Sequence, residues 1–398
     1  TAAAACATLT VDGTLAANNA ITVSGATLFT STGAYACGAI SGTRTFTGDF
    51  QLDAGSTWAS VSAGPCRFGG NFMNNATAFS GNGTYTFTGV SKTISGATTT
   101  ALTAMTIGGG GSYALDASST LMVSGTTTLA GSFANNGTMT INTTSGTGTL
   151  TQGTGANLAV TSGNSAIGIT LAATASGNTV TYNTGSVAPT PKVTSYYNLT
   201  LTSSATSGNW NTGISVGGTL TMSGAFTQNN FGSASITGNL IVNGPNVTAG
   251  SVVTVGGYLI VSSGTFYAQS SPGLNVTGTT TVSGGTLRLG NAATFTGDFL
   301  LNGGTYNNSG NGAVTFGGNL TYTSGSITTF GTGTNTFSGT SKTITGTMTI
   351  PKVTVIGTIT NAGTLTVSAA LAGSGTLTQG ANSTLNIGGT SASLNLAA

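Results

Sequence analysis

A repeat of about 20 residues limits what this chain can fold into. In the C-terminal half, seven glycines each precede a short strand-like segment, and they follow one another at almost equal spacings. The residue two positions before each glycine is always apolar, although only 38% of the chain is apolar. An apolar site that recurs at a fixed spacing indicates a repeat architecture, in which each unit stacks on its neighbours. The glycines are Gly218, Gly238, Gly257, Gly278, Gly297, Gly318 and Gly339, and the apolar residues before them are Val216, Ile236, Val255, Val276, Phe295, Phe316 and Phe337.

The spacing of apolar residues within each unit predicts β-strands. Apolar side chains recur two and four positions after most of the glycines, as in Leu220 and Met222. This period of two is that of a strand with one face turned inward. A unit of this length, with glycine turns, predicts one coil of a β-solenoid, because a single coil cannot bury its apolar side alone. We therefore predict an all-β, parallel β-solenoid with essentially no α-helix, in which the seven apolar residues before the glycines form one inward ladder.

The charge content excludes several functional classes. The chain has 7 Lys and Arg, 5 Asp or Glu and no His, which gives a net charge of +2. This leaves no basic field for nucleic acid and no imidazole for a catalytic triad or a His-ligated metal. No apolar run approaches the roughly 20 residues that would span a membrane. We expect no enzyme activity, no cofactor, no nucleic-acid partner and no membrane span.

The first part of the chain repeats the last part. Thr45–Phe50 matches Thr294–Phe299, Phe68–Asn71 matches Phe316–Asn319, and Ser91–Ile94 matches Ser341–Ile344, at offsets of 248 to 250. The hexapeptide Gly148–Gly153 recurs as Gly375–Gly380. No charged or Pro-rich linker separates the copies. We predict one continuous solenoid over residues 1–398, with repeat blocks 1–163 and 217–398 and a variant middle, 164–216.

Several segments resemble a known group of proteins. Thr179–Tyr182 followed by Tyr196–Leu201, together with Gly363–Val367 and Gly375–Gly389, resembles the repeats of secreted bacterial β-strand-repeat surface proteins, which are similar in style to autotransporter passenger domains. The resemblance implies export, a solenoid fold and a surface, adhesive or fibrous role. It supplies no catalytic residue. We expect an extracellular or cell-surface location with the signal peptide already removed, although Thr1 could equally be an arbitrary starting point.

The three cysteines, Cys6, Cys37 and Cys66, all lie near the start of the chain. An odd count in an exported protein indicates one pair and one remaining thiol. We favour a disulfide between Cys37 and Cys66, which follow each other in consecutive coils. A Cys6–Cys37 pair is the rival, and reduced buried thiols are the remaining alternative.

The polar residues give no clear catalytic or metal site. Asp49 and Asp53 would lie about 13 Å apart on a strand, too far for a glycosidase pair, and Asn302 replaces the second carboxylate in the repeat copy. Gly108–Gly111 lacks the Asp of a calcium-binding repeat. Asn-x-Ser/Thr sequons are frequent, and they indicate either glycosylation or Asn and Thr side chains that hydrogen-bond between coils.

Three functions remain. The favoured one is a structural subunit of an extracellular filament or surface layer, with the chain itself as partner. The alternative is a cell-surface adhesin that binds glycans or host surfaces. Ice binding needs regular outward Thr pairs, and the positions after each repeat glycine carry them only intermittently, as at Thr219 and Thr221.

Self-assembly is expected because both ends of the chain lack charge. Stacked coils leave unpaired backbone groups at each end, and proteins normally block such edges with charge, Pro or a cap. Here uncharged strand-like segments stand at both ends. Two open edges form a heterologous contact that propagates into a fibre. The residues assigned to this head-to-tail contact are Ala7, Leu9, Val11, Leu394 and Leu396.

Overall fold

The structure is a computed structural model of the whole chain. It describes residues 4–16, 19–37, 42–60, 64–162, 167–205, 208–210, 213–269, 273–388 and 394–395. Within these ranges the secondary structure is entirely β, and every pairing between the named strands is parallel. No helix in the described part of the chain could cross a membrane. The chain is therefore a parallel β-solenoid, and the predicted fold class is confirmed.

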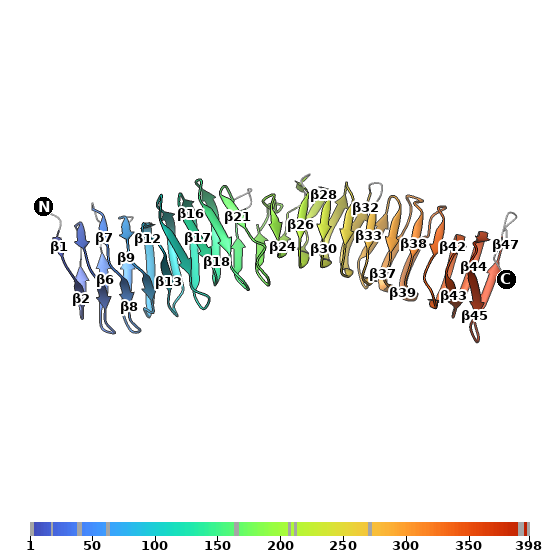
Figure 1. Cartoon of the computed structure of the whole chain (residues 1–398), viewed down its shortest axis with the longest axis horizontal. Helices are drawn as coiled ribbons and strands as arrows, with labels where there is room; N and C mark the ends of the chain where they lie inside the picture. Colours follow the sequence, from blue (N-terminus) through green and yellow to red (C-terminus); the bar gives the residue numbers. More distant parts are fainter. Residues whose placement is uncertain are drawn as a thin grey trace. The chain divides into compact units, whose positions relative to one another are not determined.

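Each coil contains up to three strand positions, separated by turns (Figure 1). The chain divides into two compact units, Thr1–Thr184 and Gly185–Ala398, which are described separately. Within each unit, a strand pairs with the strand at the same position one coil before it and one coil after it. The prediction of one continuous solenoid, with its block boundaries, stays a prediction.

Unit 1 contains β1 to β22. First-position strands are β1 (Ala4–Cys6), β4 (Ile21–Val23), β7 (Arg44–Phe46) and β10 (Cys66–Phe68). Second-position strands are β2 (Leu9–Val11), β5 (Thr27–Phe29), β8 (Phe50–Leu52), β11 (Phe72–Asn74), β13 (Lys92–Ser95), β15 (Ser112–Leu115), β17 (Ser132–Asn135), β19 (Thr149–Gln152) and β21 (Thr170–Ala172). Third-position strands are β3 (Thr14–Ala16), β6 (Ala34–Cys37), β9 (Thr57–Ser60), β20 (Asn157–Val160) and β22 (Thr179–Asn183). Four strands run from the third position into the next coil: β12 (Ala78–Phe87), β14 (Thr100–Ile107), β16 (Thr120–Leu129) and β18 (Thr138–Ser145).

Unit 2 contains β23 to β47. First-position strands are β23 (Ser195–Tyr196), β26 (Ile214–Val216), β29 (Ala234–Ile236), β31 (Val253–Val255), β33 (Leu274–Val276), β36 (Ala293–Phe295), β38 (Val314–Phe316), β40 (Asn335–Phe337) and β47 (Leu394–Asn395). Second-position strands are β24 (Asn198–Ser203), β27 (Thr219–Gly224), β34 (Thr280–Val282), β41 (Lys342–Thr345), β43 (Thr358–Asn361) and β45 (Thr376–Gln379). Third-position strands are β25 (Gly208–Trp210), β28 (Thr227–Phe231), β35 (Thr286–Leu289) and β46 (Thr384–Ile387). Continuous strands join the second and third positions in β30 (Asn239–Ala249), β32 (Leu259–Ala268), β37 (Phe299–Asn307) and β39 (Leu320–Thr329), and the third and next first positions in β42 (Thr347–Val355) and β44 (Thr364–Ala372).

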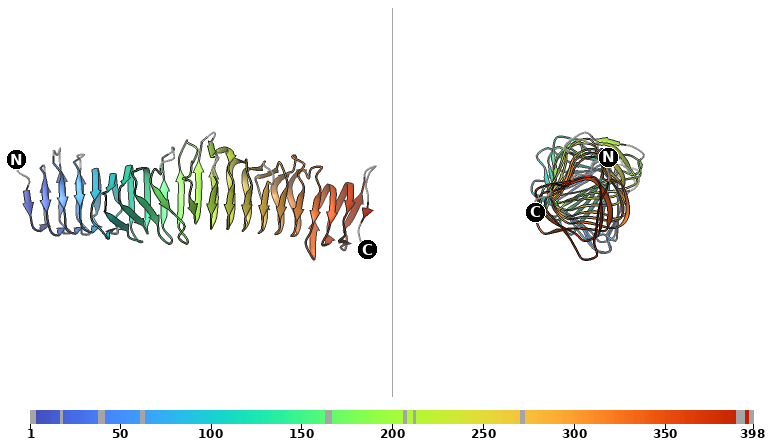
Figure 2. Two further views of the ribbon diagram at one scale, coloured as in Figure 1. Left: turned by 45° about the horizontal axis from the view of Figure 1, so that its top comes forward. Right: turned by 90° about the vertical axis from the view of Figure 1, so that its right-hand side faces the viewer.

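The core of each unit is made of ladders of inward side chains. Figure 2 shows the successive strands of each unit that carry these ladders. Along the strands, buried residues alternate with exposed or half-buried ones, as in β26, where Ile214 and Val216 are buried and Ser215 is exposed. Because neighbouring strands pair in register, like residues meet from coil to coil. Stacking therefore buries apolar area that a single coil would leave in water.

The two copies of the repeated block fold alike. In unit 1, the Phe46 and Phe68 rings stack with centroids 5.4 Å apart, and in unit 2 the Phe295 and Phe316 rings stack at 5.7 Å. Hydrogen bonds at the following turn also repeat. The Asn71 N–H donates to Asp49 Oδ1 at 2.8 Å, and the Asn319 N–H donates to Asp298 Oδ1 at the same distance. Similar sequence thus produces similar local geometry in both units.

Candidate functional site

The seven residues assigned to the core ladder lie in consecutive first-position strands of unit 2. Val216 pairs with Ile236, and the register continues without a shift to the Phe316–Phe337 pair. Each of the seven is at most 1% exposed. They lie on the strand before each repeat glycine, and their role is to hold neighbouring coils together.

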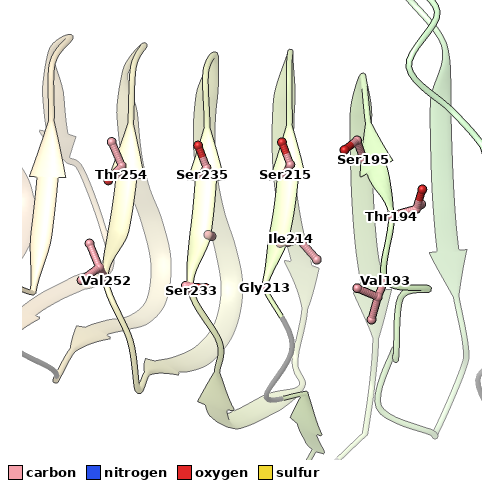
Figure 3. A pocket seen from close by; sticks show the side chains of 11 residues that line it. Val193, Thr194, Ser195, Gly213, Ile214, Ser215, Ser233, Ser235, Val252 and Thr254 are labelled. Carbon is pink, nitrogen blue, oxygen red and sulfur yellow. The ribbon is translucent and has the colours of Figure 1, made fainter.

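A groove lies on the outer surface of these strands in unit 2. It has a volume of about 630 Å³ and crosses the first four strands of the sheet, β23, β26, β29 and β31 (Figure 3). Ser195, Ser215, Ser235 and Thr254 line it in one row, because they pair in register on neighbouring strands. Its wall includes the exposed side chain of Val193.

The hydroxyl row continues beyond the groove. The outward residue of each of the next five strands is again Asn or Thr, and pairing keeps these residues in one column at the strand spacing of about 4.8 Å, up to Ala372 of β44. No charged residue lines the groove itself. The surface can therefore donate and accept hydrogen bonds to a neutral ligand, and it offers no group for acid–base catalysis. The continuing column contains Asn275, Thr294, Thr315, Thr336 and Thr354.

The sequence contains a signal for this column that the prediction missed. The residue three positions before each repeat glycine is Ser, Thr or Asn in all seven repeats, from Ser215 to Thr336. The prediction of outward hydroxyls considered only the positions after the glycines. The strand before each glycine also turns one side chain outward, between two buried ones.

The residues assigned to assembly lie in the outer described coils of their units. Ala7 is exposed and precedes β2, Leu9 is half-buried, and Val11 is 7% exposed. Leu394 pairs with Leu371 through its backbone, and its side chain lies outside the described residues, as does all of Leu396.

The coil Thr376–Ile387 leaves core positions uncovered. Leu377 and Leu385 are half-buried, and Ile387 is 42% exposed. Their partners one coil earlier, such as Leu365 and Val367, are 0% exposed. Among the described strands, β45 pairs only with β43, and β46 pairs only with β44. This coil therefore presents an apolar surface and an unpaired backbone edge.

A buried polar cluster occupies the region of the cysteines in unit 1. Arg44 is 0% exposed, and its Nη1 donates to the Tyr35 hydroxyl at 2.6 Å, while its Nη2 donates to the Gly64 carbonyl. Cys66, also buried, pairs in register with Arg44. Burial raises the pKa of the nearby Tyr85 hydroxyl, which accepts a 2.8 Å hydrogen bond from Trp58 Nε1. The cluster is held together by hydrogen bonds within the core.

The structure leaves the cysteine pairing as a prediction. Cys37 ends β6, where its backbone pairs with Ser60, and its side chain lies outside the described residues. Cys6 is half-buried in β1. The Cys37–Cys66 disulfide and its Cys6–Cys37 rival both remain predictions.

The acidic residues take part in turns and in contacts between coils. The Asn319 N–H at Asp298 holds the pKa of that carboxyl below its usual value, although partial burial opposes the shift. Hydrogen bonds from Thr30 and Thr32 lower the pKa of Asp12 in the same way. No group of three His, Cys, Asp or Glu side chains that could hold a metal occurs in the described ranges.

Comparison with known proteins does not assign the chain to a family. No family model, no curated protein and no solved structure matches this chain. The function has to be argued from the fold and its surfaces.

Proposed function

We propose that this chain is a structural subunit of an extracellular filament or surface layer, in which copies join head to tail, coil on coil. The observation that carries the proposal is that β45 and β46, in the coil Thr376–Ile387, each pair on one edge only among the described strands. The same hexapeptide in unit 1, Gly148–Gly153, contains β19, which pairs with β21 of the next coil. Leu150 of β19 is 0% exposed. The sequence of this coil is therefore compatible with being covered, and it contains no charged residue that would prevent stacking.

The first described coil of unit 1 offers a matching surface. Each of its strands, β1, β2 and β3, pairs with only one described neighbour. Leu9 and Leu15 are half-buried, whereas Tyr35, the partner of Leu15 in the next coil, is 1% exposed. A second copy placed on this edge would bury these apolar side chains and extend the backbone pairing. The low net charge of +2 offers little long-range repulsion to such contacts.

The extracellular location rests on composition and on the resemblance to secreted repeat proteins. With 3% charged residues, the surface is made mainly of hydroxyl, amide and small side chains. Continuous ladders and few titratable groups fit a structural role.

An adhesin is the second candidate, and the hydroxyl groove of unit 2 favours it. Its row of Ser195, Ser215, Ser235 and Thr254 could bind the hydroxyls of a neutral glycan. Ice binding has less support, because the column places a single hydroxyl or amide group on each of its strands. The neighbouring outward position varies among Gly, Thr and Ser, as at Gly217 and Thr237.

Sedimentation velocity and negative-stain microscopy test the proposal on the full chain over a range of concentrations. We expect concentration-dependent filaments. Ile387→Asp, which places a charge on the uncovered surface, should abolish them, whereas Asn386→Asp, on the outward side of the same strand, should not. A chain that stays monomeric at high concentration would contradict the filament and favour the adhesin.

A further inference from the structure

The ladder of third-position strands in unit 2 is interrupted between β39 and β42. Ser326 and Ile327 of β39 pair with Thr305 and Tyr306 of β37. No described strand pairs with the other edge of this part of β39. The facing segment Thr347–Ile350 of β42 pairs only with β44 among the described strands. Two strand edges therefore face each other without pairing.

The interruption coincides with a change of coil length. A long coil separates Phe316 from its register partner Phe337, and a coil three residues shorter separates Phe337 from its own partner, Val355. Such a change does not by itself break a ladder, because all three strand positions stay paired where unit 1 shortens by five residues after Thr128. In unit 2 the first-position strands stay paired and the described third-position strands do not, so the cause lies in the segment that leads to the third position.

The gap forms a groove of about 440 Å³. Tyr322 and Ile327 are half-buried there, although Leu301, the partner of Tyr322 in the preceding coil, is 2% exposed. Thr347 and Thr349 also line the groove, and none of its lining residues is charged. Pro351, which has no N–H, follows Ile350 and limits new pairing to about four residues.

The corresponding coil of unit 1 has a smaller gap. Leu102 follows Ile94 by eight residues, whereas Ile350 follows Ile344 by six. The longer segment allows Gly81 of β12 to pair with Leu102 of β14, and the remaining groove is about 240 Å³. The longer segment of unit 1 thus allows partial pairing at the third position, whereas the segment of unit 2, two residues shorter, leaves this position unpaired among the described strands.

We propose that the groove between β39 and β42 binds an extended, uncharged peptide segment of a partner protein by β-strand addition. An extended backbone is the ligand that satisfies rows of unpaired N–H and C=O groups at strand edges. The uncharged lining of the groove and its two half-buried core residues select a segment with apolar side chains at alternate positions.

A labelled, end-capped peptide with the sequence of residues 363–368, Gly-Thr-Leu-Thr-Val-Ser, is a suitable probe, because its central residues pair with the other edge of β42. We expect saturable binding to the full chain by fluorescence anisotropy and slower amide exchange in Thr347–Ile350. A scrambled peptide should not compete. Ile327→Asp should weaken binding at least about tenfold, while Thr321→Asp, on the same strand outside the groove, should leave it unchanged.

A second variant tests the cause of the gap. Insertion of Ala-Thr after Gly346 copies Ala97 and Thr98 of unit 1, and it should restore part of the pairing and weaken peptide binding, since the unit 1 groove is only about 240 Å³. Absence of saturable binding, or equal binding by all variants, would overturn the proposal. A chain that instead dimerises through the groove, with Ile327→Asp dissolving the dimer, would also overturn it by making a second copy the occupant. These outcomes do not depend on filament formation.

Discussion

The hexapeptide Gly148–Gly153 of unit 1 and its copy Gly375–Gly380 of unit 2 have one sequence in two environments. Both keep the same hydrogen bond: Asn135 Nδ2 donates to Gln152 Oε1 at 2.7 Å, and Asn361 Nδ2 donates to Gln379 Oε1 at 2.8 Å. Their burial differs, because β21 covers the first copy and no described strand pairs with the outer edge of the second. Leu150 is 0% exposed, while Leu377 is half-buried.

This comparison separates the hydrogen bonds that a coil forms with the preceding coil from the burial that the next coil provides. Hydrogen bonds to the preceding coil form in both copies, so they follow from the local sequence and the coil before it. Burial of the leucine needs a coil on each side. A coil therefore gains much of its apolar stabilisation only when the next coil is added, as expected for a repeat fold with nearest-neighbour coupling.

The largest loss of stability is expected for core phenylalanines that have a coil on each side in both repeat blocks. Phe68→Ala and Phe316→Ala should each destabilise their unit by about 3–5 kcal/mol. The cost should be greater for Phe68, because its ring also contacts Phe72 and Tyr85. Hydrogen exchange resolved along the chain is the appropriate measurement, since long repeat arrays need not unfold in one step. Equal losses would show that these extra ring contacts contribute nothing.

The leucine pair tests the comparison directly. Leu150→Ala should cost about 2–5 kcal/mol by leaving a cavity between two coils. Leu377→Ala should cost at most about half as much in the monomer, since solvent already reaches that side chain. Exchange rates of β19 and β45 amides measure both. A larger loss for Leu377 would contradict the assigned burial.

Alkaline pH should affect the two Ser-Lys-Thr-Ile coils differently. Burial raises the pKa of Tyr113 to about 12, and its hydroxyl donates to the Gly70 carbonyl at 2.9 Å. In the unfolded chain the pKa is about 10, so this stabilisation is complete below pH 10 and is lost as the pH rises to about 12. The Tyr113 side chain is buried, so the loss is at most about 2–3 kcal/mol, since one pKa unit corresponds to about 1.4 kcal/mol.

The control for this prediction is the residue at the same place in unit 2. Ile359 pairs with Lys342 as Tyr113 pairs with Lys92, and it cannot ionise. Tyr113→Phe should remove the part of the alkaline loss that is local to β13 and β15, while the buried Tyr85, whose pKa is also raised, keeps its own contribution in unit 1. The same loss in the variant would assign it to another group.

The smallest effect concerns Asp298. Its folded-state pKa lies below the unfolded value, so its contribution is present above the unfolded pKa and is lost as the pH falls through the folded pKa. Asp298→Asn should cost less than about 1 kcal/mol at neutral pH and nothing in acid, because the carboxyl is exposed. Exchange of the Asn319 amide reports the change. A cost that persists in acid would indicate a packing effect instead.

The sequence was sufficient for the architecture and for the order of the core ladder. Glycine spacing and period-two apolar positions identify coils, and register then follows because a slip would turn Val216 and its partners outward. It was not sufficient for features that depend on the path of a whole coil. Arg44 is buried where Tyr35 of β6 and Gly64, which precedes β10, both accept hydrogen bonds from its guanidinium, and the matching position in unit 2 holds Ala293. The groove beside β42 lies where the segment from Ile344 to Ile350 is two residues shorter than its counterpart in unit 1.

Amide exchange in Thr376–Ile387 tests the central claim, that this coil is completed by another copy. The account predicts fast exchange in dilute monomer and slow exchange, like that of Thr149–Val160, once the protein is concentrated enough to assemble. Ile387→Asp should keep exchange fast at every concentration. Exchange that stays fast in the wild-type chain at all concentrations, with no polymer, would contradict the account.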